Sequence, residues 1–485
     1  MIAPYLNRLA EKGAPVLGLS QDDATLTDQF AEQMEIRFPL DRDAGFQLSR
    51  YYKVETVPTL LVLNERDAVV RVEPGFDKQS LNEIAGLFEI ADVASPFDGN
   101  PASKPGCSSR HLEAVTADQA APALDLHSSK GWAASRLTVS DEEDQYEYCF
   151  RLLGDALPVI PPTAERVQRM LRGMDPKEII ARIPPNFAEA TVEKIAANAV
   201  MAGCVPEMMR VLLPLTRAVC DERFNIHGVQ ATTHFAAPLI VVNGPVRQEL
   251  GFHSRQNVFS NVRRANSTLG RALQLILLNL GGARPDAIDM SALGNPGKFS
   301  YCIAENEEEN PWEPLHVESG FQAAESTVTL FAGEAPHGVS EHTARTARGV
   351  LKTVTYALAT VWSYRTCTVA EALVVLCPEH VKTIHREGWS KQNVREFLFE
   401  NTGIPLRCYG EEESEGVRMR AHYTEVTIDG EPCYRKFRSP DQIKLVVAGG
   451  TAGKFSAVVG SWSAGPRGSQ MVTYPIGESN ANHAS

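Results

Sequence analysis

Five short runs of apolar residues constrain the fold of this chain more than any other feature. Each run is bounded by polar or glycine-rich residues and is shorter than an ordinary helix. Nearly continuous apolar runs of this kind are typical of strands that are buried on both faces. The second part of the chain is therefore predicted to be an α/β domain with a mostly buried sheet. The runs are "APLIVVN" (237–243), "FSYCIA" (299–304), "STVTLFA" (326–332), "EALVVLC" (371–377) and "IKLVVAGG" (443–450).

Helices are predicted before and between these runs. The segment "TVEKIAANAVMAGC" (191–204) places its apolar residues on one helical face, and "RANSTLGRALQLILLNLGG" (264–282) repeats the pattern and ends at Gly281. We expect these helices to cover the sheet. Residues 141–485 are thus predicted to form the larger domain, and an arrangement of that domain in two lobes stays open.

The N-terminal residues 1–92 show a separate alternation of helix and strand patterns. A helix is predicted to stop at Gly13, and "APVLGLS" (14–20) predicts a buried strand. Residues 57–72 predict two strands joined by a polar turn, and a helix follows near residues 78–89. Residues 93–140 are rich in Pro, Ser, Ala and Gly without a sustained period, which indicates a linker.

The stretch "VETVPTLLVLNERDAVVRV" (54–72) resembles a thioredoxin-like or peroxiredoxin-like domain of the thiol-disulfide reductase type. In that family the Val-Pro-Thr element carries a cis proline beside the redox thiols, and here that proline would be Pro58. The resemblance implies a truncated domain, since the first strand and the CxxC pair of the family have no counterpart here. Two alternatives stay open: a start codon assigned too late, or a domain that lost its redox role.

Five other segments resemble the poorly characterised UGSC-like domain, and the similarity would cover residues 105–475. Some members of that family are selenoproteins, and some follow a thioredoxin-like domain. The family name reflects a selenocysteine-Gly-Ser-Cys motif, whose nearest match here is Cys107-Ser108-Ser109 with Arg110 in the last position. The resemblance therefore implies a shape more than a reaction. The segments are "GDALPVIPPTAERVQRML", "VEKIAANAVMAGCVPEMM", "TTHFAAPLIVVNGPV", "AENEEENPWEPLHVESGF" and "VVAGGTAGKFSAVVGSW".

Composition excludes some classes of partner. The formal net charge is −13 over 485 residues, which argues against a broad nucleic-acid surface because phosphate binding needs clustered Lys and Arg. No apolar run approaches the length that crosses a bilayer, so no membrane partner is expected. The nine cysteines show no CxxC, which indicates free thiols in a reducing compartment, and the cytoplasm is the expected location. An oligomer stays open.

The residues that follow the apolar runs are candidates for a ligand site, because ligands of open α/β sheets bind beyond the carboxyl ends of the strands. Asn243 ends the first run, and the sequence 449–454 ("GGTAGK") follows the last. A glycine-rich turn exposes backbone N–H groups to an anion, and the lysine adds a positive charge. The segment matches neither the Walker pattern nor GxGxxG, so no nucleotide cofactor is implied. The predicted substrate-binding residues are Asn243, Gly449, Gly450, Gly453 and Lys454.

The acidic segment "YCIAENEEENPWEPLHVE" (301–318) is the most unusual part of the chain. Crowded carboxylates can act as a general acid or base near neutral pH, or bind a divalent metal. We expect Glu305 and His316 to handle protons, with Cys302 beside them as a candidate catalytic thiol. A metal set of His234, His316 and Glu305 is the other possibility, although no metal-binding spacing supports it. A solvated acidic loop is the simpler alternative.

Three functions follow from these residues. The first is a thiol-associated oxidoreductase or lyase that acts on a small anionic substrate, with a thiol reductase as a further partner. In this hypothesis Cys107 or Cys302 carries the chemistry, and Cys107 lies near Lys104, Arg110 and His111, which would favour its thiolate. The second function is a metal-assisted lyase or hydrolase. The third is a non-catalytic binding scaffold.

Overall fold

The computed structural model divides the chain into two compact units, residues 1–124 and residues 125–485. The structure describes the chain except for residues 1, 23, 44–45, 55, 65–67, 96–102, 105–106, 109–133, 135–138, 140–142, 261–262, 286, 364–366, 368–369, 410–422, 463–467 and 478–485.

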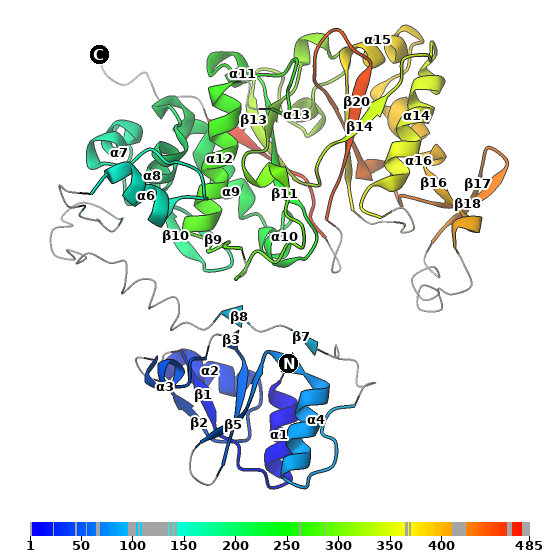
Figure 1. The fold of residues 1–485 in the computed structure, drawn as a ribbon. Coiled ribbons are helices and arrows are strands. Elements are labelled where there is room, and N and C mark those ends of the chain that lie inside the picture. The colour runs from blue at the N-terminus through cyan, green and yellow to red at the C-terminus, as the bar shows by residue number, and fades with distance from the viewer. Residues whose placement is uncertain are drawn as a thin grey trace. The chain divides into compact units, whose positions relative to one another are not determined.

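The N-terminal unit contains helices and small two-stranded sheets (Figure 1). Strand β1 pairs with β2 in parallel, β4 pairs with β5 antiparallel, and helices α1 and α4 share an apolar core around Tyr5 and Leu81. The elements are α1 (Ala3–Glu11), β1 (Gly18–Ser20), α2 (Ala24–Gln33), β2 (Leu40–Arg42), α3 (Gln47–Tyr51), β3 (Thr56–Val57), β4 (Thr59–Leu63), β5 (Val69–Pro74), β6 (Phe76–Asp77), α4 (Lys78–Leu87), β7 (Ser103–Lys104) and β8 (Cys107–Ser108).

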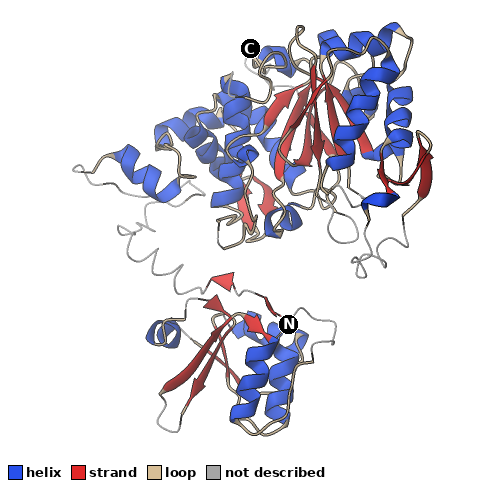
Figure 2. Ribbon diagram, turned by 45° about the vertical axis from the view of Figure 1, so that its right-hand side comes forward, coloured by secondary structure: helices blue, strands red, loops and turns tan. Residues whose placement is uncertain are grey.

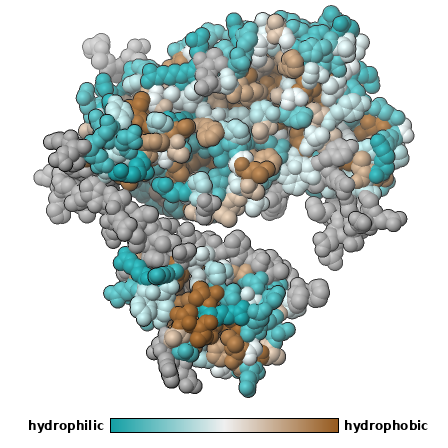
Figure 3. All heavy atoms as spheres, in the orientation of Figure 1, coloured by the Kyte–Doolittle hydropathy of each residue, from teal (hydrophilic) through white to brown (hydrophobic). Residues whose placement is uncertain are grey.

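The sequence predicted most of this unit, with one error. The helix that stops near Gly13, the strand pair of residues 57–72 and the helix at 78–87 are confirmed, and the Val57–Pro58 bond is cis as the family resemblance implies. The prediction of a buried strand at residues 14–20 was wrong. Leu17 and Leu19 are 63% and 43% exposed, whereas Val16, which points to the opposite face of this extended segment, packs against the apolar core. Figure 3 shows apolar side chains gathered on a face of this unit.

The large unit is an α/β structure. Its first part contains α6 (Gln145–Leu153), α7 (Ala164–Leu171), β9 (Ile179–Ile183), β10 (Ala188–Thr191), α8 (Val192–Ala202), α9 (Met209–Val219), α10 (Ile226–Ala231), β11 (Ala237–Asn243), α11 (Val246–Glu249), α12 (Arg264–Asn279), β12 (Cys302–Ala304), α13 (Leu315–Glu318), β13 (Ser326–Gly333) and β14 (His337–Ser340). Its second part contains α14 (Ala347–Thr360), β15 (Ala372–Leu376), α15 (Pro378–Arg386), α16 (Lys391–Asn401), β16 (Gly403–Pro405), β17 (Glu425–Ile428), β18 (Glu431–Arg435), β19 (Ile443–Val447), β20 (Phe455–Gly460) and β21 (Val472–Ile476). All five apolar runs contain strands, as predicted.

The core consists of two four-stranded sheets that pack face to face. The first has the order β12-β11-β13-β21, and the second has the order β14-β20-β15-β19. Alternate residues such as Leu239 and Val241 of the first sheet share one buried cluster with Val375 and Val459 of the second. The intervening residues of each strand face helices, α8, α9 and α12 on one side and α14, α15 and α16 on the other. Figure 2 shows the strands between two groups of helices.

This four-layer arrangement differs from the single helix-covered sheet that the sequence predicts. A strand with helices on one face and a second sheet on the other is apolar on both faces, as is a strand with helices on both faces. The apolar runs are therefore the same in the two cases, and they do not reveal the number of sheets.

The two halves of the large unit follow the same plan. In each half the first two strands are parallel and the third is antiparallel to the first: β11, β12 and β13 in one, β15, β19 and β20 in the other. The last strand of each half joins the sheet of the other half, so β14 pairs with β20 and β21 pairs with β13. Asn243 at the end of β11 and Cys377 after β15 therefore occupy equivalent places.

Candidate functional site

Cys377 lies where strand β15 passes into helix α15, and the local sequence determines its position. Pro378 begins the helix, and proline suits the first helical turn because its φ is already helical and its missing N–H is not needed there. Cys377 is the N-cap, so its side chain faces the first turn of the helix. His380 is the third helical residue, and its imidazole interacts with the Cys377 thiol.

Two protein groups hold the His380 ring in one orientation. Nε2 lies 3.0 Å from the carbonyl oxygen of Glu341, and Nδ1 lies 2.7 Å from Oγ of Ser456. Because a carbonyl oxygen only accepts hydrogen bonds, Nε2 carries the proton and Nδ1 of the neutral ring is the acceptor. The same Ser456 hydroxyl accepts the backbone N–H of Cys377 at 3.1 Å. This arrangement of a thiol, an oriented imidazole and a third group is the one that activates a nucleophile.

The pKa of the Cys377 thiol distinguishes it from other cysteines. Burial opposes its ionisation, but the hydrogen bond and the charge of His380 outweigh burial, so the pKa lies below its ordinary value. Burial also works against protonation of His380, and the thiolate of Cys377 raises the pKa of the imidazole despite it. Burial raises the pKa of six other cysteines of the described chain: Cys149, Cys204, Cys220, Cys302, Cys367 and Cys433.

The glycine-rich turn predicted to bind an anion lies at the edge of this site. The backbone N–H of Gly453 binds the carboxylate of Glu379 at 2.9 Å, so the turn already holds a carboxylate from the first turn of α15. Lys454 donates to the carbonyl of His342 at 3.3 Å, and the N–H of Gly449 donates to the carbonyl of Ser254 at 2.9 Å. Gly450 packs against the side chain of Gln256.

Glu305 directly follows strand β12 in the first half of the large unit. Its side chain is fully buried. Its carboxylate accepts the amide of Asn243 at 2.6 Å, the backbone N–H of Leu315 at 2.8 Å and the amide of Asn310 at 2.9 Å. Burial raises the pKa of Glu305, although nearby Lys391 acts in the opposite direction. The carboxylate therefore ties strand β11 to the start of α13.

His316 lies in helix α13 and is fully buried, with neither ring nitrogen hydrogen-bonded to the described protein. Its nearest carboxylate is that of Glu307, at 3.9 Å from Nδ1. Oδ1 of Asn243 and Oγ1 of Thr327 are also buried without a partner in the described protein, and these two residues are paired across β11 and β13. Unpaired polar atoms therefore gather at the ends of strands β11 and β12.

The acidic segment is an ordered loop rather than a freely solvated one. Arg247 binds Glu307 at 2.9 Å and Glu308 at 3.1 Å. Glu309 binds Lys382 of α15 at 2.8 Å, so the loop of the first half contacts a helix of the second half.

The residues around Glu305 and the residues around Cys377 adjoin at the ends of strands β12 and β19. The N–H of Asn306 donates to the carbonyl of Val447 at 2.7 Å, and the Asn306 amide donates to the carbonyl of Gly449 at 3.2 Å. The N–H of Val447 lies 3.5 Å from the carboxylate of Glu305. Asn243, Glu305 and His316 on one side, and Cys377, His380 and the turn at 449–454 on the other, therefore share one end of the core.

Two residues predicted from the sequence, His234 and Cys302, lie elsewhere in the large unit, and a third, Cys107, belongs to the N-terminal unit. His234 precedes β11 and lies at the opposite end of that strand from Asn243, where it binds Glu334 at 2.8 Å. Cys302 is buried in the core between the first sheet and its helices, and burial raises the pKa of its thiol. Cys107 is in β8, opposite Val57, and its side chain lies outside the described residues.

The predicted metal set is not assembled. His234 is separated from His316 and Glu305 by the length of strand β11, whereas the metal hypothesis assumed that all three lay at one end of the sheet. In the described part of the chain, no group of three or more His, Cys, Asp or Glu side chains is placed to hold a metal ion.

The sequence around Cys377 contains a local signal for this site. In "EALVVLCPEH" the cysteine ends an apolar run, and Pro378 and His380 follow it. A cysteine, a proline and a histidine three residues after the cysteine predict an N-cap thiol that faces an imidazole. Ser456 and Glu341 come from distant segments, and no local pattern links them to this site.

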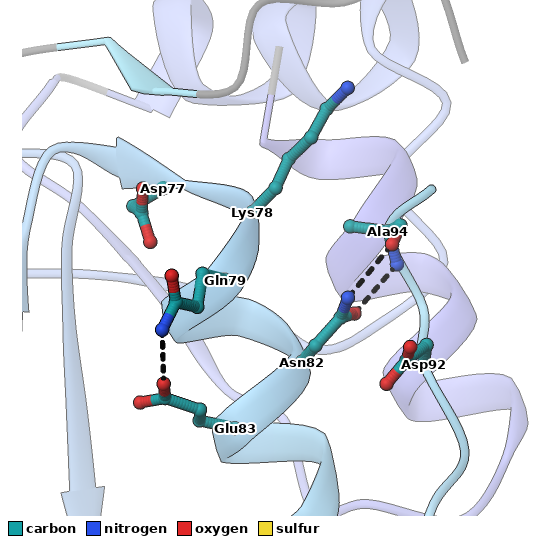
Figure 4. Close-up of a pocket in the computed structure, with 7 residues that line it drawn as sticks. All are labelled: Asp77, Lys78, Gln79, Asn82, Glu83, Asp92 and Ala94. Carbon is teal, nitrogen blue, oxygen red and sulfur yellow. Dashed lines mark hydrogen bonds between the residues drawn. The ribbon is translucent and has the colours of Figure 1, made fainter. Parts of the chain in front are cut away.

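A hollow in the N-terminal unit offers no comparable chemistry (Figure 4). Asn82 uses its amide to bind the backbone of Val93 and Ala94, and Gln79 binds Glu83 at 2.9 Å. These contacts hold the segment after helix α4 in place. Within the residues described, none of the helices is both long and apolar enough to cross a bilayer.

Comparison of the sequence with protein-family models, with curated proteins and with solved structures gives no match. The thioredoxin-like and UGSC-like resemblances therefore stay predictions. The functional assignment rests on the geometry of the site.

Proposed function

We propose that this protein is a thiol-dependent enzyme that acts on a small anionic substrate, with Cys377 as its nucleophile. The observation that carries the proposal is the Ser456 hydroxyl, which joins the backbone of Cys377 to an imidazole that Glu341 holds in one orientation. Cys377 replaces Cys107 and Cys302 in this role. The larger unit would hold the reaction, and the N-terminal unit is proposed as a thioredoxin-like domain, although residues 1–92 contain no cysteine.

The reaction step is the addition of a thiolate to an electrophilic carbon. The thiol gives its proton to the hydroxyl oxygen of Ser456, whose own proton passes to Nδ1 of His380, and a bond forms between Sγ of Cys377 and the substrate carbon. The π electron pair of that carbon moves to the neighbouring atom, which receives the proton back from the imidazolium. The groups that shift the thiol pKa are His380 and Ser456 and include no second cysteine, which favours this chemistry over a disulfide exchange.

An anionic substrate suits the surroundings of Cys377. The N–H of Gly453 binds a carboxylate in this structure, that of Glu379, and a substrate carboxylate or phosphate could take the same place. Lys454 adds a positive charge at the turn, and the N-terminus of α15 adds a partial positive charge beside the thiol. Free reactive thiols also fit a reducing compartment such as the cytoplasm.

Alkylation with two reagents of similar size tests the proposal. Iodoacetate is an anion and iodoacetamide is neutral; both transfer a two-carbon group to sulfur and release iodide. We expect the ratio of the iodoacetate rate to the iodoacetamide rate at Cys377 to exceed the ratio for free cysteine at least tenfold. Lys454→Gln should lower this preference, and the matched control Lys177→Gln, an exposed site in another part of the unit, should keep it.

Peptide mass spectrometry would measure the two rates at each cysteine. A ratio at Cys377 equal to that of free cysteine would refute the anionic substrate. A rate at Cys377 no higher than that of the other buried thiols would refute the nucleophile itself, and would favour the non-catalytic scaffold.

A further inference from the structure

A pocket of the large unit lies beside the start of strand β11, whereas Asn243 at the other end of this strand lies on the side of Cys377. Its volume is about 470 Å³, which lies within the range of small-molecule sites. The lining is mostly apolar and aromatic, with hydroxyl groups and one imidazole among it. The lining residues are Thr232, Thr233, His234, Phe235, Ala292, Leu293, Trp362, Ser363 and Trp462.

The aromatic wall of the pocket is held rigidly. The indole N–H of Trp462 donates to Oγ1 of Thr232 at 3.0 Å. The Trp462 ring fills the space beside Gly228, where a Cβ atom would come within 2.3 Å of it. Phe235 packs against the ring of His234 with 5.0 Å between the centroids. Flat, fixed aromatic surfaces of this kind favour stacking of a planar ligand.

The polar end of the pocket is a histidine–glutamate pair. Nε2 of His234 lies 2.8 Å from Oε1 of Glu334, so Nε2 donates and Nδ1 is the acceptor of the neutral ring. Nδ1 has no hydrogen-bond partner within the described protein. Glu334 is fixed in turn, because its Oε2 accepts the backbone N–H of Trp362 at 3.2 Å. Nδ1 is itself buried, so a ligand group that reaches it would supply the hydrogen bond that it lacks.

The described lining residues give an anion no positive partner. No lysine or arginine is among them, and the carboxylate of Glu334 binds the imidazole of His234. The fully buried Lys436 interacts with the charge of Glu334, and its ammonium group donates to the carbonyl of Ser363 at 2.6 Å. Tryptophan faces attract cations and accept neutral rings.

We propose that this pocket binds a planar ring compound, neutral or cationic, which stacks on Trp362 or Trp462 and donates an N–H or O–H group to His234. The site is distinct from Cys377, and it does not depend on the proposed thiol chemistry. It gives His234 a binding role in place of the metal-ligand role predicted from the sequence.

Three isosteric probes test the proposal: benzamide, benzamidine and benzoate. They share one ring and one planar substituent, which is neutral in the first, cationic in the second and anionic without an N–H group in the third. We expect saturable binding of benzamide and benzamidine by calorimetry or ligand-observed NMR, and at least tenfold weaker binding of benzoate. Benzoate binding as tight as that of benzamide would overturn the assigned chemistry.

Variants of the lining residues establish where the probes bind. Ala292→Trp places an indole on the rim and should abolish probe binding, and His234→Phe should weaken it about tenfold. His227→Phe is the matched control, because His227 is exposed and does not line the pocket, and it should bind as the parent protein does. Cys377→Ser should leave probe binding unchanged, so the two proposals can fail separately. Unchanged binding in Ala292→Trp would refute the location.

Discussion

Iodoacetamide should modify Cys377 about fifty times faster than Cys204, Cys220 and Cys367 at pH 7, although Cys377 itself is buried. Burial raises the pKa of Cys204, Cys220 and Cys367 to about 12, whereas that of Cys377 lies below the ordinary value near 9. The thiolate fractions at pH 7 are then about 10⁻⁵ for the three and at least about 10⁻² for Cys377, a ratio of about 1,000. The lower nucleophilicity of a less basic thiolate reduces this advantage to about 50-fold.

The source of the reactivity can be tested in the same assay. His380→Gln removes the imidazole and leaves Cys377 buried, so its thiol pKa should rise and alkylation at pH 7 should slow at least tenfold. His385→Gln is the matched control, because His385 lies in the same helix with its side chain exposed, and it should leave the rate unchanged.

The measurement is time-resolved alkylation between pH 5 and pH 10, with each cysteine quantified by peptide mass spectrometry. The rate at Cys377 should reach half its maximum at a lower pH than the rates at the other three cysteines, and His380→Gln should move that midpoint upward. Equal rates at Cys377 and Cys204, or an unchanged midpoint in His380→Gln, would refute the reasoning. Circular dichroism of each variant would show that the fold is retained.

Two further predictions concern stability. Gly244→Ala should lower the free energy of unfolding by more than about 2 kcal/mol in urea titrations, because Gly244 has φ +82° and a Cβ would lie 2.2 Å from the carbonyl oxygen of Glu325. Gly251 has a similar φ and open space around it. A smaller loss of unfolding free energy in Gly251→Ala would therefore separate the steric clash from backbone strain. Hydrogen bonds from Thr353 and from the turn at residues 343–344 lower the pKa of Glu341 to about 2, so its ionised form stabilises the fold above pH 4.5. This contribution should be lost as pH falls from 4.5 towards 2. Glu341→Gln should therefore lose less thermal stability than the parent protein over that range. An equal fall of the melting temperature with pH in both proteins would contradict the prediction.

The sequence predicted local elements better than the arrangement of the core. The apolar runs and the helix ending near Gly281 reflect burial and backbone conformation, which depend on nearby residues. The contact of Asn243 with Glu305 was not predicted, because the sequence does not show that β11 and β12 are neighbours. The two-sheet core did not follow, since pairings such as β13 with β21 join segments with no local signal for each other.

Site residues were missed or misplaced for related reasons. Cys302 alternates with Ile303 along β12, and the alternation alone does not say which face meets helices and which meets the second sheet. His234 was grouped with His316 although the two lie at opposite ends of β11. Cys377 was hidden at the end of an apolar run, where a cysteine looks like one more buried residue.

The exchange of last strands between the halves has a consequence for biosynthesis. Strand β13 needs β21, and the paired residues Leu330 and Val472 lie about 140 positions apart. A ribosome that has released the first half has therefore not yet supplied the strand that covers the open edge of β13. That edge stays available for wrong pairing until the last residues emerge, and chaperone dependence or aggregation of C-terminally shortened chains would follow from it.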